Sequence, residues 1–156
     1  MTSIEIRHVV ACPYTLARAY LAGDVSGRAL RKEAGRMTLH APLAGADVSK
    51  NVVVTFAAGD DPMHFDEPWR VHWTPEGGGP YPDFDGQLTV RADEDYDTAI
   101  LELRGEYVPP GGAVGAAFDR AVGSRIATAT AKDLLTQIAS GMESRYAADE
   151  RSKKEA

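Results

Sequence analysis

The feature that most constrains the fold is a change of hydrophobic period at Pro109 and Pro110. Between residues 36 and 107 apolar and polar residues alternate, whereas after the two prolines apolar residues recur every three to five positions. Alternation is typical of strands with one buried face, and the longer period predicts an amphipathic helix. That helix, over residues 113–145, would be about 50 Å long. Because a single helix is not stable alone, its apolar stripe is expected to pack on the buried face of a sheet.

Five segments of the alternating region are predicted strands. Turn-forming residues separate them, and the connections are short enough for neighbouring strands to pair in antiparallel order. Residues 51–57 form the β-branched run NVVVTFA, and the other strands have one apolar and one polar side, which indicates a sheet with one buried face. The predicted strands cover residues 36–41, 51–57, 69–74, 87–91 and 98–107.

The start of the chain predicts one more strand and two short helices. Residues 3–11 alternate, which is typical of a strand. Its apolar side carries Ile4, Ile6, His8 and Val10. Pro13 opens a helical pattern that Gly23 is expected to end. A second short helix is expected over residues 26–34.

The end of the chain carries two features that modify the long helix. Gly123 lies inside it, so a bend or break is expected there. Residues 147–156 are charged and poor in apolar side chains, and they are predicted to form a flexible tail. The domain organisation expected from the sequence is therefore a single domain over residues 1–146 followed by that tail.

Composition excludes several classes of function. The net charge of −6 makes the chain a poor partner for phosphate backbones, so no nucleic acid partner is expected. No apolar run is long enough to span a bilayer, so stable membrane insertion is not expected. The first ten residues lack the apolar core of a signal peptide, and the single Cys12 gives no disulfide. A cytoplasmic location is the resulting expectation.

Candidates for metal and cofactor binding are weak. His64, Asp66, Glu67 and His72 are close in sequence, but they match no metal-binding motif, and strand alternation would point them in different directions. The glycine-rich segments match neither a P-loop nor a dinucleotide-binding motif. No GxSxG motif is present, and Cys12 has no identifiable partner base. We therefore expect neither a metal nor a cofactor.

The second half of the chain resembles a known superfamily. The segments that carry the resemblance are YPDFDGQLTV and LELRGEYVPPGGAVGAAFDRAVGSRIATATAKDLLTQIA, in which a strand ending in G-x-Y leads through two prolines and several glycines into a helix. This order resembles the helix-grip fold of the START-like superfamily, and most closely its bacterial polyketide cyclase/dehydrase and lipid-transport type. The resemblance implies an α+β fold with a curved antiparallel sheet of six to seven strands around a long C-terminal helix. It also implies an internal ligand cavity.

Aromatic side chains on the inward side of the predicted strands suit such a cavity, because apolar pockets are lined mainly by large apolar groups with a few polar ones. Ordinary core packing explains each aromatic residue taken alone. As a set they favour a pocket, because glycines near the strand-to-helix corner supply little volume beside them. The candidate cavity residues are His8, Trp69, Trp73, Phe84, Leu88, Leu101, Leu103, Tyr107, Phe118 and Val122.

Three functions are compatible with this sequence. The favoured one is the binding or carriage of a small hydrophobic molecule between sheet and helix, without a reaction. The second is an enzyme similar to polyketide cyclases and dehydrases, acting on an aromatic or polyketide-like substrate with His8 and Tyr107 as its acid–base and hydrogen-bonding groups. The third is a non-catalytic module that forms a homodimer through its strand edges or its long helix.

Overall fold

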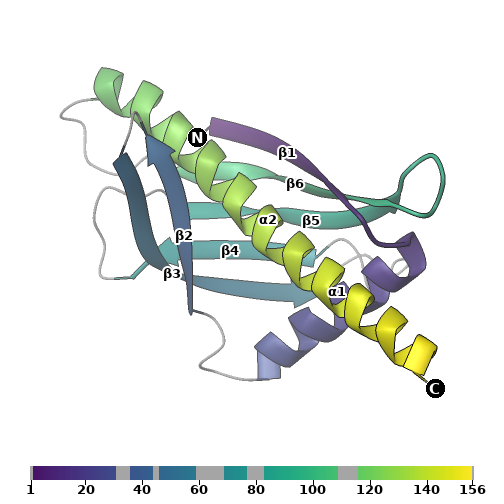
Figure 1. Ribbon diagram of the computed structural model, residues 1–156. Helices are drawn as coiled ribbons and strands as arrows, with labels where there is room; N and C mark the ends of the chain where they lie inside the picture. Colours follow the sequence, from purple (N-terminus) through teal and green to yellow (C-terminus); the bar gives the residue numbers. More distant parts are fainter. Residues whose placement is uncertain are drawn as a thin grey trace.

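The protein forms one antiparallel sheet with a long helix lying across one of its faces (Figure 1). The computed structural model describes residues 2–30, 36–43, 46–58, 69–76, 83–108 and 116–155. The elements are β1 (Thr2–Val10), α1 (Tyr14–Leu30), β2 (Arg36–Leu43), β3 (Ala46–Ala58), β4 (Trp69–Pro75), β5 (Asp83–Ala92), β6 (Ala99–Val108) and α2 (Ala116–Glu155). This architecture confirms the predicted α+β class, the antiparallel sheet and the long C-terminal helix.

The described sheet has six strands in the order β1-β6-β5-β4-β3-β2. Every neighbouring pair is antiparallel, and all pairs except β1 with β6 join strands that are consecutive in the chain. The first strand therefore lies beside the last one, with Ile4 opposite Gly105 and His8 opposite Leu101. The sheet is a meander whose final strand returns to meet the N-terminus of the chain.

The two faces of the sheet follow the predicted alternation. In β4, the side chains of Trp69, Val71 and Trp73 are buried, whereas those of Arg70 and His72 are exposed. The same pattern holds in β5 and β6, where one face is apolar and enclosed and the other carries charges. The inner and outer positions predicted for these three strands are confirmed.

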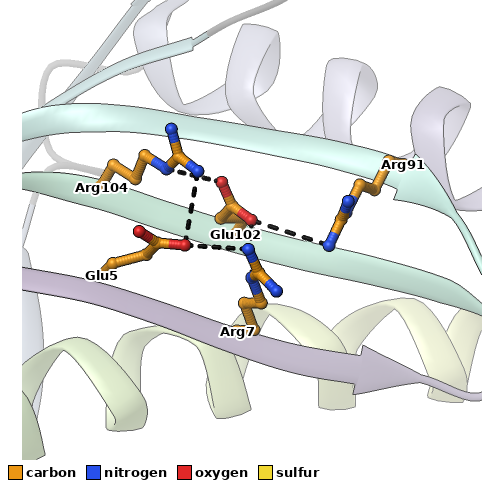
Figure 2. A network of polar contacts seen from close by, with 5 residues as sticks. All are labelled: Glu5, Arg7, Arg91, Glu102 and Arg104. Atoms are coloured by element: carbon orange, nitrogen blue, oxygen red, sulfur yellow. Dashed lines mark hydrogen bonds and ion pairs between the residues drawn. The ribbon is translucent and has the colours of Figure 1, made fainter.

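The charged outer face is organised around Glu102 on β6 (Figure 2). Its carboxylate lies 2.9 Å from Nε of Arg7, 2.8 Å from Nε of Arg104 and 3.9 Å from the guanidinium of Arg91. Glu5 completes the group, 3.0 Å from Arg7 and 3.4 Å from Arg104. We call these five residues the outer charge network. It ties together the outer surfaces of β1, β5 and β6.

Two glycines bring β5 and β6 unusually close together. Gly86 and Gly105 are paired, and a Cβ atom on Gly105 would lie 2.6 Å from Cα of Gly86. On Gly86 it would collide with the carbonyl oxygen of Arg104. In both cases it would also lie 2.6 Å from Cζ of Phe84. The absence of side chains here therefore makes room for the Phe84 ring beside the glycine pair.

The helix after β1 differs from the prediction. One helix, α1, runs without interruption from Tyr14 to Leu30, where the sequence predicts two short helices. Gly23 does not end it, because a glycine inside a helix costs only about 1 kcal/mol relative to alanine. The packing of α1 against α2, β3 and β5 outweighs that cost. Residues 31–35, which include the predicted end of the second helix, lie outside the described residues.

The long helix also differs from the prediction. α2 has 40 residues, about 60 Å, and neither Gly123 nor Gly141 breaks it. Residues 147–155, predicted to be a flexible tail, form its last turns. The hydroxyl of Tyr20 donates a hydrogen bond of 2.6 Å to Asp149, which attaches this end of α2 to α1. The predicted start of the helix at residue 113 lies outside the described residues.

α2 rests mainly on the two edge strands, β1 and β2, and more lightly on β6. No comparable backbone contact joins it to β3, β4 or β5 in the described part of the chain. The central strands therefore stand away from the helix, and their inward side chains occupy the space between the two layers. Any interior site of this fold must lie among those side chains.

Candidate ligand-binding site

The centre of the inner face is a row of three aromatic residues. In the strand register, Trp73 on β4 lies opposite Phe84 on β5, and Phe84 lies opposite Tyr107 on β6. The rings of Trp73 and Phe84 are stacked, with their centroids 4.2 Å apart and their planes 16° from parallel. Such a stack brings two flat apolar surfaces into close contact. We call these three residues the aromatic row.

Two further rows lie beside the aromatic row. Trp69 is opposite Leu88, which is opposite Leu103. In the next row Leu101 lies between Val90 on β5 and His8 on β1. The strand register thus places eight of the ten predicted cavity residues on one face, from four strands. The side chains of the other two, Phe118 and Val122 on α2, lie outside the described part of the structure.

These side chains are tightly enclosed. Trp73, Leu88, Leu101 and Leu103 have no exposed surface, and Phe84 and Tyr107 are 1% exposed. A side chain without accessible surface touches neither solvent nor an empty space large enough for a water molecule. The inner face is therefore a close-packed layer at these positions, and a ligand can reach it only if covering side chains move.

One polar atom in this layer has no partner. The indole Nε1 of Trp73 is buried, and its N–H finds no hydrogen-bond acceptor among the described residues. Buried polar groups are nearly always paired, and a buried donor without an acceptor costs about 1–3 kcal/mol. The Trp73 N–H is the feature of the inner face that apolar packing does not explain.

The two predicted acid–base residues do not come together. His8 pairs with Leu101, and Tyr107 lies six residues further along β6. At about 3.4 Å per residue, this separates them by about 20 Å along the strands. Among the described residues, neither side chain has a hydrogen-bond partner that would orient it. One small substrate cannot contact both groups at its reacting atoms.

The rim of the inner face is more accessible than its centre. On β1, Ile4, Ile6 and His8 are half-buried, and Phe56 on β3 is half-buried at the other side of the sheet. His8 therefore belongs to the rim of the site. The sequence pattern places His8 on the correct face but gives no measure of its depth.

Cys12 is buried, and its surroundings do not activate it. Burial raises the pKa of its thiol, and the nearby carboxylate of Glu143 raises it further. Glu143 also accepts a hydrogen bond of 3.0 Å from the backbone N–H of Ala11, which fixes the carboxylate beside the thiol. The thiolate, which is the nucleophilic form, is therefore disfavoured.

Metal and membrane sites receive no support from the described residues. No group of three or more histidine, cysteine, aspartate or glutamate side chains is placed to hold a metal ion there. His64, Asp66 and Glu67 lie outside the described residues, and His72 is exposed on the outer face. Neither described helix, residues 14–30 or 116–155, has the length and apolar character needed to cross a bilayer.

Two elements of the site are missing from the sequence-based prediction. The unpaired N–H of Trp73 depends on what surrounds one atom, and no sequence pattern reports that. Gly86 is different, because a glycine inside the alternating segment DFDGQLTV signals a close backbone approach and could have been used.

Comparison with solved structures supports the fold. A protein of Thermus thermophilus, TTHA0849, superposes with a TM-score of 0.52 at 11% identity, covering 92% of this chain and 99% of that one. The Zhui aromatase/cyclase of Streptomyces sp. R1128 gives a TM-score of 0.49 at 15% identity, with 90% and 91% covered. A START superfamily protein from Mycobacterium smegmatis gives 0.41 at 11% identity, with 94% and 97% covered. No protein-family model and no curated protein matches the chain.

The likeness to these structures is one of fold. The superposition on TTHA0849 is a likeness of fold, and the strand order and the helix that lies across the sheet agree with the helix-grip architecture expected from the sequence. This confirms the predicted fold resemblance.

Proposed function

We propose that the protein binds a small, largely apolar molecule between the sheet and α2, and that Trp73 donates a hydrogen bond to an acceptor atom of that molecule. The observation that carries the proposal is the unpartnered indole N–H of Trp73. A ligand carbonyl or hydroxyl oxygen would satisfy this donor, and the stacked Phe84 ring offers a flat apolar surface beside it.

The position of Trp73 supports this assignment. It lies on β4, one of the central strands to which α2 makes no extensive backbone contact. A ligand at this place is held by side chains from sheet and helix, so it can enter when side chains move without any strand leaving the sheet. The half-buried Phe56 on β3, the strand next to β4, and the half-buried Ile4 on β1 mark the two sides of the sheet from which a ligand would enter.

Carriage in solution is part of the proposal. The net charge of −6 opposes stable docking on anionic membranes, so an apolar cargo would travel with the protein dissolved in water. A polyketide cyclase-like activity that uses both His8 and Tyr107 gains no support from the geometry, because about 20 Å separates them along the strands.

The test compares two probes of nearly the same shape, 1-indanone and indane. Only the ketone has a hydrogen-bond acceptor, and one such bond corresponds to about tenfold in affinity. We expect the protein to bind 1-indanone about tenfold more tightly than indane. The Trp73→Phe variant should bind the two probes equally, because it keeps an aromatic ring but loses the N–H.

Trp69→Phe is the matched control. It removes the only other tryptophan of the chain from the same face of the same strand, and it should keep the preference for the ketone. With two tryptophans in the chain, the two indole N–H resonances in a nitrogen–proton NMR spectrum can be assigned from these variants. Equal binding of both probes by the unmodified protein, or a ketone preference that survives in Trp73→Phe, would refute the proposal.

A further inference from the structure

A pocket lies between α1 and α2, away from the inner face of the sheet, and it opens to solvent beside the exposed residues Gln137, Gly141 and Arg145. Its volume is about 130 Å³. Leu21 of α1 and Ile138 and Met142 of α2 form its apolar wall, and Tyr20, Gln137 and Arg145 supply polar atoms. None of the eight predicted cavity residues whose side chains the structure describes lines it. Whatever binds here does so independently of the aromatic row.

Gly141 keeps this cavity open. A Cβ atom added to Gly141 would have no heavy atom within 4 Å, so the space above it is empty of protein. Glycine weakens a helix relative to alanine, and a larger residue would fit here without collision at its Cβ atom. Gly141 is itself exposed, so it lies where the pocket opens to solvent, and a larger side chain there would narrow the opening.

Arg145 provides a positive charge at one end of the cavity. Its guanidinium lies 4.8 Å from the centre of the Tyr20 ring, in a cation–π contact. The nearby carboxylate of Asp149 accepts the 2.6 Å hydrogen bond from the Tyr20 hydroxyl. Among the described residues, no carboxylate lies within ion-pair distance of Arg145. The guanidinium is positioned by the aromatic ring while its charge is not neutralised by a partner.

Gln137 marks the other end of the cavity, two helical turns away, at about 12 Å. Its side-chain amide donates hydrogen bonds to the backbone carbonyl of Thr38, at 3.0 Å, and to Asp133, at 2.8 Å. These bonds fix the Gln137 side chain between α2 and β2. The cavity thus has one fixed neutral end, an apolar middle and one cationic end.

We propose that this cavity binds a small organic monocarboxylate. The carboxylate pairs with Arg145, and a short apolar body lies over Gly141 against Leu21, Ile138 and Met142. A single guanidinium matches one carboxylate, because two parallel N–H groups can bind its two oxygens. An apolar cavity of about 150 Å³ can hold benzene, so the body is about the size of one six-membered ring.

Benzoate is the probe that tests this site, and benzyl alcohol is its neutral counterpart. On the full chain, followed by NMR shifts of the Gly141 amide and by calorimetry, we expect benzoate to bind at least tenfold more tightly than benzyl alcohol. Arg145→Gln should weaken benzoate binding at least tenfold and abolish the difference between the two probes. Absence of benzoate binding at millimolar concentration overturns the proposal.

The variant Gly141→Leu fills the cavity and should also weaken benzoate binding at least tenfold, with no loss of melting temperature. If this variant fails to fold, Gly141→Ala, which adds one methyl group, should give a smaller loss of affinity. Arg151→Gln removes the same charge from an exposed position of the same helix and should change affinity less than twofold. An equal effect of Arg151→Gln, or benzoate binding unchanged in both glycine variants, contradicts a site between α1 and α2.

The Trp73→Phe variant separates this proposal from the function proposed above. It should lose its preference for 1-indanone while binding benzoate as the unmodified protein does. If benzoate binding disappears with Trp73, the benzoate site is the interior layer and the inference is wrong.

Discussion

The two faces of the sheet are built from the same strands, but they differ in whether their polar atoms have interaction partners. On the outer face, the single carboxylate of Glu102 has three arginines around it, at 2.8 to 3.9 Å. On the inner face, the N–H of Trp73 has no acceptor among the described residues. On the outer face Glu102 is buried, but its carboxylate is paired by arginines that are 52–61% exposed, whereas the inner face offers Trp73 neither water nor a described acceptor. The polar atom that needs an explanation is therefore the inner one.

The two faces also differ in the kind of interaction that stabilises the fold. The inner face stabilises the fold through enclosed apolar side chains, whose removal leaves cavities. The outer face stabilises it through ion pairs between side chains that are mostly exposed, and these contribute less and depend on salt. Substitutions on the two faces should differ in size and in salt dependence.

The largest effect is expected on the inner face at Phe84. Phe84→Ala removes a ring that is 1% exposed and stacked on Trp73, and we expect the free energy of unfolding to fall by about 4 kcal/mol. Urea denaturation measures this. On the outer face, Val53→Ala should cost about 0.5 kcal/mol, because Val53 is 37% exposed. Similar losses at the two positions would contradict the assignment of the faces.

The second-largest loss of stability is expected at the glycine pair of the inner face, Gly86 and Gly105. Gly105→Ala places a methyl group 2.6 Å from Cα of Gly86 and from Cζ of Phe84, so strand and ring must shift. We expect a loss of about 3 kcal/mol in the same measurement. Gly141→Ala is the control, since its methyl group meets no atom within 4 Å, and it should leave stability unchanged or raise it. A tolerated alanine at Gly105 would show that β5 and β6 can separate without cost.

A smaller effect is expected in the outer charge network. Glu102→Gln removes the carboxylate that three arginines share, and it should lower stability by about 1 kcal/mol at low salt. The loss should shrink when salt is added, because the arginine side chains are 52–61% exposed. Denaturation at low and high salt measures both values. A loss that does not change with salt would show that Glu102 acts through packing.

The smallest effect should appear at alkaline pH, at the contact between α1 and α2. The hydrogen bond to Asp149, followed by burial, raises the pKa of Tyr20 to about 12. Because the folded state holds this proton more tightly than the unfolded state, the stabilisation is complete below pH 10 and is lost as the pH rises towards 12. Tyr20→Phe should therefore show a shallower fall in stability over this range, as measured by urea denaturation at a series of pH values. Identical pH profiles would contradict the coupling of Tyr20 to Asp149.

The alternation of residues is enough to predict which side chains of β4, β5 and β6 face inward. It works because a period of two assigns each residue of a strand to one face, whatever the partner strand is. It cannot predict the outer charge network. Arg7 and Glu102 are 95 residues apart, and their contact depends on β1 pairing with β6.

Glycine is a misleading signal in both helices. Gly23 indicates a helix end and Gly123 a break, but a cost of about 1 kcal/mol each is smaller than what tertiary packing provides. Gly141 is more informative, because a glycine beside the apolar stripe of a helix can indicate a pocket where a larger side chain would otherwise lie. The enclosure of the aromatic row could not be predicted, because the depth of a side chain depends on how far the sheet stands from the helix.

The pairing of β1 with β6 has a consequence for how the chain acquires its structure during synthesis. Of the described strands β1 is made first, yet its described neighbour in the sheet, β6, is made last. Contacts between such distant segments form slowly, because a long stretch of chain must be closed into a loop. We expect the meander from β2 to β6 to assemble before β1 joins it, with α2 docking across both edges at the end. A nascent chain that pauses before Val108 would thus present an unpaired β1 and an uncovered aromatic surface to chaperones.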